Sequence, residues 1–386
     1  MFLTSISYAF VIYINSSFLQ KFIDKDYIGL LYGIGSVITL ITLSNISPVL
    51  RSFGHYKTML GITLMESTAM GAASCLDALN SSQTMTEFKI FYLPLMAAIS
   101  FLLFSLSAVL MRVSLDLYLE KYSKNEETGN ARGGFLTTMN LAIGISPYLV
   151  GRILSDGDFW KVYFISLMIF APIMLIVLLK MKEVPDVRYH DAPFFAGLKK
   201  IWKNKNIKNI FISGFMLELF YSWMTIYMPI YLYSVMKFTW AEIGLMFSIM
   251  LTPFIFLQLP LGKIADRYIG EKEILTSGYI ITGLSTAYLA FITKPDFIVW
   301  TIALFVTRIG AAAIEIMNET YFFKKVSPED TDILGFFRNA SPIAYIIGPI
   351  VASVFIYYFN FNYLFLILGI AMLYGTRHSL AIKDTL

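Results

Sequence analysis

Long uncharged runs of hydrophobic residues follow one another along the chain, and polar residues collect in short segments between them. Each run has about the 20 residues that a helix needs to cross a bilayer. The runs are continuous rather than alternating between apolar and polar positions, which predicts helices and not the strands of a membrane β-barrel. Twelve spans are predicted, at residues 1–20, 26–47, 58–76, 90–114, 133–153, 160–180, 208–235, 240–261, 273–292, 297–318, 334–358 and 361–378.

The composition points to the same class of protein. Of the 386 residues, 57% are hydrophobic and only 15% are charged, whereas soluble domains contain about 25% charged residues. The net charge of +4 is spread over the connecting segments, so no nucleic-acid partner is expected and the lipid bilayer is the expected surroundings. Cys75 is the single cysteine, which excludes an internal disulfide and leaves packing as its expected role.

The longest polar stretch divides the spans into two sets of six. We predict an N-terminal six-helix bundle at 1–180, a cytoplasmic linker at 181–207 and a C-terminal six-helix bundle at 208–386. Lys and Arg residues on the linker side of the membrane outnumber those on the other side by about three to one. This bias predicts a multi-pass protein of the cell inner (plasma) membrane with both termini in the cytoplasm.

Similar segments recur at matching places in the two halves. IGLLYGI at 28–34 matches IGLMFSI at 243–249, and Arg51-Ser-Phe-Gly54 matches Arg267-Tyr-Ile-Gly270. The matches come in the same order relative to the spans, so a six-helix unit is expected twice. In this register the seventh span begins about eight residues earlier than the first, so the first helix is expected to be either truncated at Met1 or naturally short.

The segment between the eighth and ninth spans carries the most specific motif. It reads GKIADRYIGEK, and its Gly262, Asp266, Arg267 and Gly270 resemble the G-x-x-x-D-R-x-G-R/K loop of the major facilitator superfamily (MFS) of transporters. The resemblance implies an all-α membrane fold of two pseudo-symmetric six-helix bundles. It also implies that these residues and Lys272 form a gating loop.

The first half holds a less complete copy of this motif. Arg51 and Gly54 are kept, but Leu50 stands where the acid is expected, which predicts a weaker latch. The alternative interpretation of both segments is a basic turn with no gating role.

Charged residues inside the predicted spans are the candidates for a substrate or proton cavity. They are Glu66, Arg112, Glu218, Arg308 and Glu315. A charge at membrane depth costs a few kcal/mol on insertion scales, so each is expected to face a partner or a wet cavity. The acids are candidates for carrying protons; the alternative is that they only form ion pairs or hydrogen bonds with the two arginines.

Three polar or aromatic residues complete the candidate cavity. Asn15 lies on the first span, and Tyr221 and Trp223 lie on the seventh. Aromatic residues in such spans also belong to interfacial belts, so stacking on a substrate is one of two interpretations.

Signals of enzymatic chemistry are missing from the sequence. The three histidines are scattered, which predicts no metal site. No Walker loop is present, so neither a nucleotide nor another cofactor is expected. Asp116 and Glu120 are too few to support a lipid-modifying membrane enzyme, although this class stays an alternative.

We therefore predict a monomeric secondary active transporter that is not an enzyme. It would move a small-molecule substrate by alternating access, coupled to protons or another ion. A drug-like compound exported against protons and an imported sugar or organic anion are both open as substrates. The second alternative is a membrane sensor or scaffold that keeps the MFS fold without transport.

Overall fold

A computed structural model describes most of the chain. The described residues are 2–44, 46–81, 86–122, 128–181, 200–326, 333, 337 and 339–383. Within them, the side chains that lie outside the description are those of residues 44, 46–51, 81, 86–91, 116–122, 128–138, 259 and 266.

Every regular element among the described residues is a helix, as the continuous hydrophobic runs predict. A helix satisfies its own backbone hydrogen bonds, which lipid cannot do. Nine of the described helices are long and apolar enough to cross a membrane. Each of the twelve predicted spans coincides with a helix or a pair of consecutive helices, so the all-α membrane fold with twelve spans is confirmed.

The chain forms two compact units. Unit 1 comprises Met1–Asp191 with Thr239–Gly244, and unit 2 comprises Ala192–Phe238 with Leu245–Leu386. The domain boundaries expected from the sequence stay a prediction, because residues 182–199 of the expected linker lie outside the described part.

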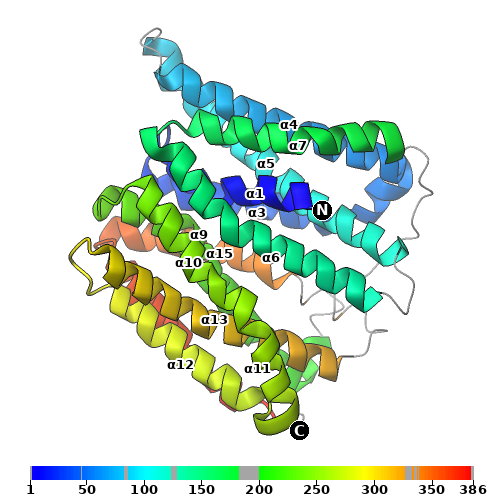
Figure 1. Ribbon diagram of the computed structural model, residues 1–386, viewed down its shortest axis with the longest axis vertical. Helices are drawn as coiled ribbons and strands as arrows, with labels where there is room; N and C mark the ends of the chain where they lie inside the picture. Colours follow the sequence, from blue (N-terminus) through cyan, green and yellow to red (C-terminus); the bar gives the residue numbers. More distant parts are fainter. Residues whose placement is uncertain are drawn as a thin grey trace. The chain divides into compact units, whose positions relative to one another are not determined.

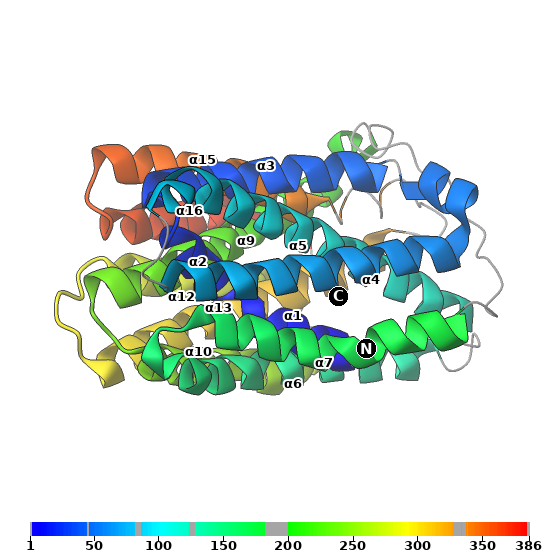
Figure 2. The same cartoon turned by 90° about the horizontal axis from the view of Figure 1, so that it is seen from above.

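Unit 1 carries the first six spans (blue to green in Figures 1 and 2). Its elements are α1 (Phe2–Ile12), α2 (Asn15–Gln20), α3 (Lys25–Ser44), α4 (Ile46–Ser81), α5 (Thr86–Tyr122), α6 (Thr128–Ile153), η1 (Leu154–Asp156) and α7 (Phe159–Lys180). The first span is thus interrupted between α1 and α2. Helix α4 packs along both α5 and α7, and α1 packs along both α6 and α7.

Unit 2 carries the other six spans (green to red in Figure 1). Its elements are α9 (Lys205–Ile230), η3 (Tyr231–Val235), α10 (Trp240–Phe256), α11 (Gln258–Ile264), η4 (Ala265–Ile269), α12 (Glu271–Leu289), α13 (Phe297–Lys325), α15 (Ala340–Tyr358) and α16 (Tyr363–Leu380). The first residues of α10 belong to the short segment grouped with unit 1. The elements η3 and η4 are single π-helical turns.

The two units repeat one packing arrangement. In unit 2, α12 packs along both α13 and α16, and α9 packs along both α15 and α16. These contacts join the third span to the fourth and sixth, and the first span to the fifth and sixth. Unit 1 joins the spans in the same places of its own helix order, which supports the six-helix repeat expected from the sequence.

The repeat extends to backbone conformation. Gly54, inside the long α4, has φ 74° and ψ 164°, and Gly270, just before α12, has φ 84° and ψ 174°. This region of backbone space is essentially restricted to glycine. The chain therefore changes direction in the same way at the start of the third span of each unit, which explains why both copies of the motif keep this glycine.

Unit 2 gains tight helix contacts from further glycines. A Cβ atom on Gly310 of α13 would lie 2.6 Å from the Gly278 carbonyl oxygen on α12, and a Cβ on Gly369 of α16 would lie 2.6 Å from the Gly283 oxygen. Glycine at these sites lets the helix backbones approach closely. At Gly71 of α4 in unit 1, the nearest atom to such a Cβ is a Leu167 methyl carbon at 3.8 Å, so this position is packed less tightly.

Candidate functional site

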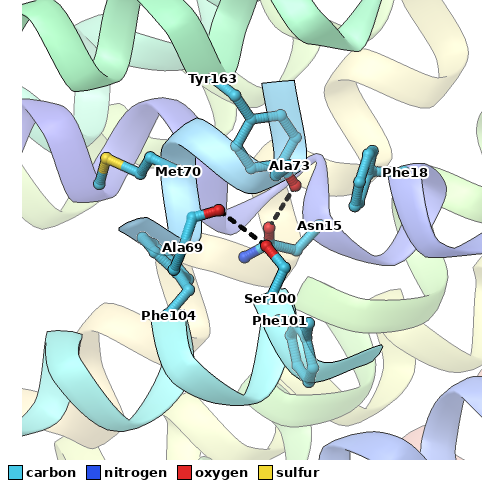
Figure 3. Close-up of a pocket in the computed structure, with 9 residues that line it drawn as sticks. All are labelled: Asn15, Phe18, Ala69, Met70, Ala73, Ser100, Phe101, Phe104 and Tyr163. Atoms are coloured by element: carbon cyan, nitrogen blue, oxygen red, sulfur yellow. Dashed lines mark hydrogen bonds between the residues drawn. The ribbon is translucent and has the colours of Figure 1, made fainter. Parts of the chain in front are cut away.

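A small pocket in unit 1 contains Asn15 (Figure 3). The Tyr163 hydroxyl on α7 donates a 2.6 Å hydrogen bond to Asn15 Oδ1 on α2, and the Ser100 hydroxyl donates to the Ala69 carbonyl at 2.7 Å. The space enclosed is about 210 Å³. These hydroxyl groups are already paired within the protein, so this Asn15 pocket is a packing feature that ties α2 to α7 more than a place for a solute.

A larger pocket of unit 1, here called the Glu66 pocket, collects two of the candidate charges. It is lined by residues of α1, α4, α5 and α6, and about 450 Å³ of space lies within it and its open mouth. Its lining residues are Thr4, Ser5, Tyr8, Glu66, Ala108, Met111, Arg112, Leu115, Met139 and Ile143. The sequence-predicted Glu66 and Arg112 are therefore brought to one pocket.

The two charges of the Glu66 pocket differ in their surroundings. Glu66 is only 2% exposed, and its Oε2 atom has no hydrogen-bond partner among the residues that the structure describes. Arg112 is exposed; its guanidinium carbon lies 6.0 Å from the centre of the Tyr8 ring, and its Nη2 lies 3.9 Å from the Met139 sulfur. No described ion pair joins Glu66 to Arg112.

Unit 2 brings another set of candidates together, on α9 and α13. The Tyr221 hydroxyl donates a 2.7 Å hydrogen bond to Glu315 Oε2. Arg308 is 2% exposed, and its guanidinium carbon lies 4.9 Å from the centre of the Phe220 ring and 5.9 Å from that of Tyr221. Such contacts stabilise a cation away from water. A carboxyl, a phenol and a guanidinium thus form one polar cluster inside the unit.

The two other candidates on α9 differ in position. Glu218, half-buried, lies one helical turn before Tyr221. Trp223 is buried, and its Nε1–H donates a 2.7 Å hydrogen bond to the Gly348 carbonyl on α15. The Tyr227 hydroxyl donates to the next carbonyl, Pro349, at 2.9 Å. Trp223 therefore fastens α9 to α15, while Tyr221 points to α13.

The GKIADRYIGEK segment is more helical than the loop expected from the sequence. Gly262 lies in α11, Asp266 and Arg267 lie in the π-helical turn η4, and the reversal is confined to Gly270 before α12 begins. Helical hydrogen bonding continues because glycine at Gly270 alone supplies the change of direction. Arg267 is exposed and Lys272 half-buried, whereas the side chains of Asp266 and of Arg51 in the first copy lie outside the described part.

Sequence reasoning missed two ion pairs at helix ends. Lys324 at the end of α13 lies 2.7 Å from Glu271 at the start of α12, and Lys21 after α2 lies 2.8 Å from Asp77 near the end of α4. Both carboxylates are fully buried. The available signal was an acid directly after the turn glycine, at a position where the MFS motif has a base.

The architecture by itself defines the class of protein. Twelve spanning segments in two units of like packing, with carboxyl and guanidinium groups inside the spans, form a multi-pass membrane protein built from an internal repeat. The family model described as Major Facilitator Superfamily matches residues 1–252 and 240–376. The chain belongs to this family of membrane transporters, and the alternative of a lipid-modifying enzyme is set aside.

Solved structures with the same fold agree with this assignment. A bacterial homologue of the iron transporter ferroportin, in an inward-facing state, is 14% identical, with a TM-score of 0.79 over 98% of this chain and 95% of that one. A variant of the nucleoside transporter NupG is 16% identical, with a TM-score of 0.71 over 98% of each chain. A bacterial metal transporter is 14% identical, with a TM-score of 0.65 over 98% of this chain and 97% of that one. No curated protein matches the chain in sequence.

Proposed function

We propose that the protein is a secondary active transporter that carries a small solute across the membrane by alternating access, coupled to protons. The single observation that carries this proposal is the Tyr221–Glu315 pair beside Arg308 inside unit 2. Ionisable groups within membrane spans are rare and mark pathways for substrates, ions or protons. A carboxyl group that one neutral hydroxyl contacts retains the capacity to take up and release a proton.

The two-unit architecture supports alternating access as the mechanism. Each unit has its own packed core and its own set of helix contacts. Repeats of this kind are expected to rock as rigid bodies, which exposes a bound solute to each side of the membrane in turn. Substrate and proton drive such a cycle only if each binds more tightly to one state than to the other.

Assignments that rest on sequence alone complete the proposal. We propose that the protein is a monomer of the cell inner (plasma) membrane. Both termini are assigned to the cytoplasm because Lys and Arg residues gather on that side. The Gly262–Lys272 segment is proposed as a cytoplasmic latch; Asp266 and Arg267 belong to its π-helical turn, and Gly270 is its pivot.

Proton coupling is tested in proteoliposomes with a pH-sensitive dye inside and an imposed pH gradient. A substrate panel added outside identifies the solute whose movement changes the internal pH. Glu315→Gln is expected to reduce this coupled proton flux at least tenfold. Glu273→Gln, which removes an exposed carboxylate from the first turn of α12, is the matched control and should behave like the wild type. Unchanged coupling in Glu315→Gln would remove this residue from the proton path.

The latch is tested separately from the coupling. Asp266→Asn is expected to slow solute movement while the melting temperature of the purified protein stays that of the wild type. Wild-type rates in this variant would contradict the latch. A correctly folded wild-type protein that moves none of the solutes would instead support the sensor or scaffold alternative.

A further inference from the structure

The Glu66 pocket holds a carboxyl group and a guanidinium apart. Glu66 forms part of its buried wall, and Arg112 lies on its exposed side. Among the described residues, neither a hydrogen bond nor an ion pair joins them. A pocket that presents both charges without letting them neutralise each other is complementary to a ligand that itself carries both.

The Glu66 carboxyl group has an oxygen atom without a described hydrogen-bond donor, and a ligand can supply one. Glu66 is 2% exposed and lines the pocket, and its Oε2 has no hydrogen-bond partner in the described part of the chain. A buried polar atom without a partner destabilises the protein, and the cost is larger when the group is charged. An ammonium group brings up to three N–H donors and the compensating charge to this position.

Among the described residues, the contacts of the Arg112 guanidinium orient it without using oxygen acceptors. Within the described part of the chain, Arg112 contacts the face of Tyr8 and the sulfur of Met139, a weak acceptor. A guanidinium has five N–H donors in a planar fork that fits a carboxylate with two parallel hydrogen bonds. The stacked position of Arg112 over Tyr8 limits the orientations of this fork and so favours a planar anionic group.

The remaining walls set the size and polarity of the ligand body. Ala108, Met111, Leu115 and Ile143 are apolar, while Thr4 and Ser5 add two hydroxyl groups. About 450 Å³ of space, its open mouth included, lies between these walls. This combination suits a short aliphatic or aromatic group between the two charges better than a polyhydroxylated or a highly charged one.

We propose that the Glu66 pocket binds a small zwitterion of the chemical class of the free apolar amino acids, with its ammonium group on Glu66 and its carboxylate on Arg112. This inference rests on the proposed function, because it takes the bound zwitterion to be the transported solute. It assigns Glu66 to substrate recognition and leaves the proton to the Tyr221–Glu315 pair.

The test uses two sets of matched probes on the purified full-length protein in detergent. One set is leucine with 3-methylbutylamine and 4-methylpentanoate; the other is phenylalanine with 2-phenylethylamine and 3-phenylpropanoate. Each set keeps one apolar body and removes one charge at a time. Isothermal titration should show, in at least one set, that the amino acid binds tenfold or more tightly than both of its singly charged analogues.

Two substitutions assign the charges to the residues. In Glu66→Gln the amino acid should bind no better than the carboxylate analogue, and in Arg112→Gln no better than the amine. Glu273→Gln and Arg377→Gln are the matched controls. Arg377 is exposed, and its guanidinium carbon lies 5.8 Å from the Tyr374 ring centre, so it reproduces the stacked cation of Arg112 in unit 2. Both controls should retain the wild-type pattern.

The outcomes separate this inference from the proposed function. If neither probe set shows the preference, or if Glu66→Gln keeps it with an unchanged melting temperature, the zwitterion site is wrong even where proton-coupled transport is found. If the binding pattern appears but proteoliposomes show no coupled flux, the site is supported and the transport proposal fails.

Discussion

The two units share a scaffold but use it differently. On the third span of unit 1, Glu66 lies twelve residues after the turn glycine and lines an open pocket, whereas Thr282 occupies the same position of unit 2. A Cβ on Gly310 of α13 would collide with the Thr282 hydroxyl oxygen, so at this position of unit 2 the space is filled by helix packing. Its acid, Glu315, is instead held by Tyr221.

This difference suggests how one fold divides two tasks. The open pocket of unit 1 offers space and a carboxyl oxygen without a described partner, which suits binding of a solute. Unit 2 keeps a carboxyl group in a defined hydrogen bond, which suits a group that must gain and lose a proton without a ligand. The predictions that follow separate these properties from the scaffold that both units share.

The largest effect is expected at the ion pairs, which fasten opposite ends of the equivalent helices α4 and α12. Lys21→Met and Lys324→Met each remove the lysine that pairs with a fully buried carboxylate, Asp77 or Glu271. Removing one partner of a buried pair costs roughly 3–5 kcal/mol. Both variants should therefore show clearly lower melting temperatures in detergent.

An exposed ion pair of the same chemistry is the control. Lys161 pairs with Asp156 at 2.8 Å, but the Asp156 side chain is 67% exposed, and exposed pairs contribute about 0–1 kcal/mol. Lys161→Met should change the melting temperature little. Equal effects of the three substitutions would show that burial of the carboxylate does not decide the stability of these helix ends.

A smaller loss is expected at the repeated turn. Gly54→Ala and Gly270→Ala place a side chain at φ 74° and 84°, and such backbone strain costs of order 1–3 kcal/mol. The two variants should lose similar amounts of thermal stability if the turn plays the same structural part in both units. A loss confined to Gly270→Ala would limit the requirement to unit 2.

Gly262→Ala tests whether every glycine of the motif, or only the turn glycine, is required for thermal stability. The nearest atom to an added Cβ is a side-chain carbon of Ile316 at 3.9 Å, and Gly262 lies within α11. This substitution should leave the melting temperature unchanged. Destabilisation as large as that of Gly270→Ala would contradict the assignment of the reversal to Gly270.

The smallest effect is expected from the hydroxyl that holds Glu315. Tyr221→Phe keeps the carboxyl group and removes one hydrogen bond of 2.7 Å. A net loss of about 1 kcal/mol corresponds to roughly a fivefold reduction in coupled proton flux. Tyr288→Phe, at an exposed site on α12, is the control; a Tyr221→Phe flux equal to that of the control would remove the hydroxyl from the coupling.

The hydrophobic pattern of the sequence was sufficient to predict the helices and their order. Span positions follow from runs of about 20 apolar residues, and the copied Gly54 and Gly270 predicted the repeat that the packing of the units supports. The segment from Gly262 was expected to be a loop because it is polar and rich in glycine. Yet only a φ value identifies which glycine turns the chain, and a sequence contains no such value.

Contacts between side chains of different helices could not be predicted from the sequence. Tyr221 and Trp223 are two positions apart on α9, but a helix turns by about 100° per residue, so one reaches Glu315 and the other Gly348. The pairing of Glu271 with Lys324 was missed for a similar reason. It depends on how the ends of α12 and α13 meet, which neither charge indicates alone.

The turn glycines show which part of the repeated unit stayed the same in both copies. The six-helix unit occurs twice in the chain, so two versions of the same fold can be compared within one molecule. The acid of the motif is present as Asp266 in one copy and replaced by Leu50 in the other, while the glycine persists in both. The side chains of the two copies differ, but the backbone conformation at the turn is the same. Gly54 and Gly270 therefore mark the feature that both copies require.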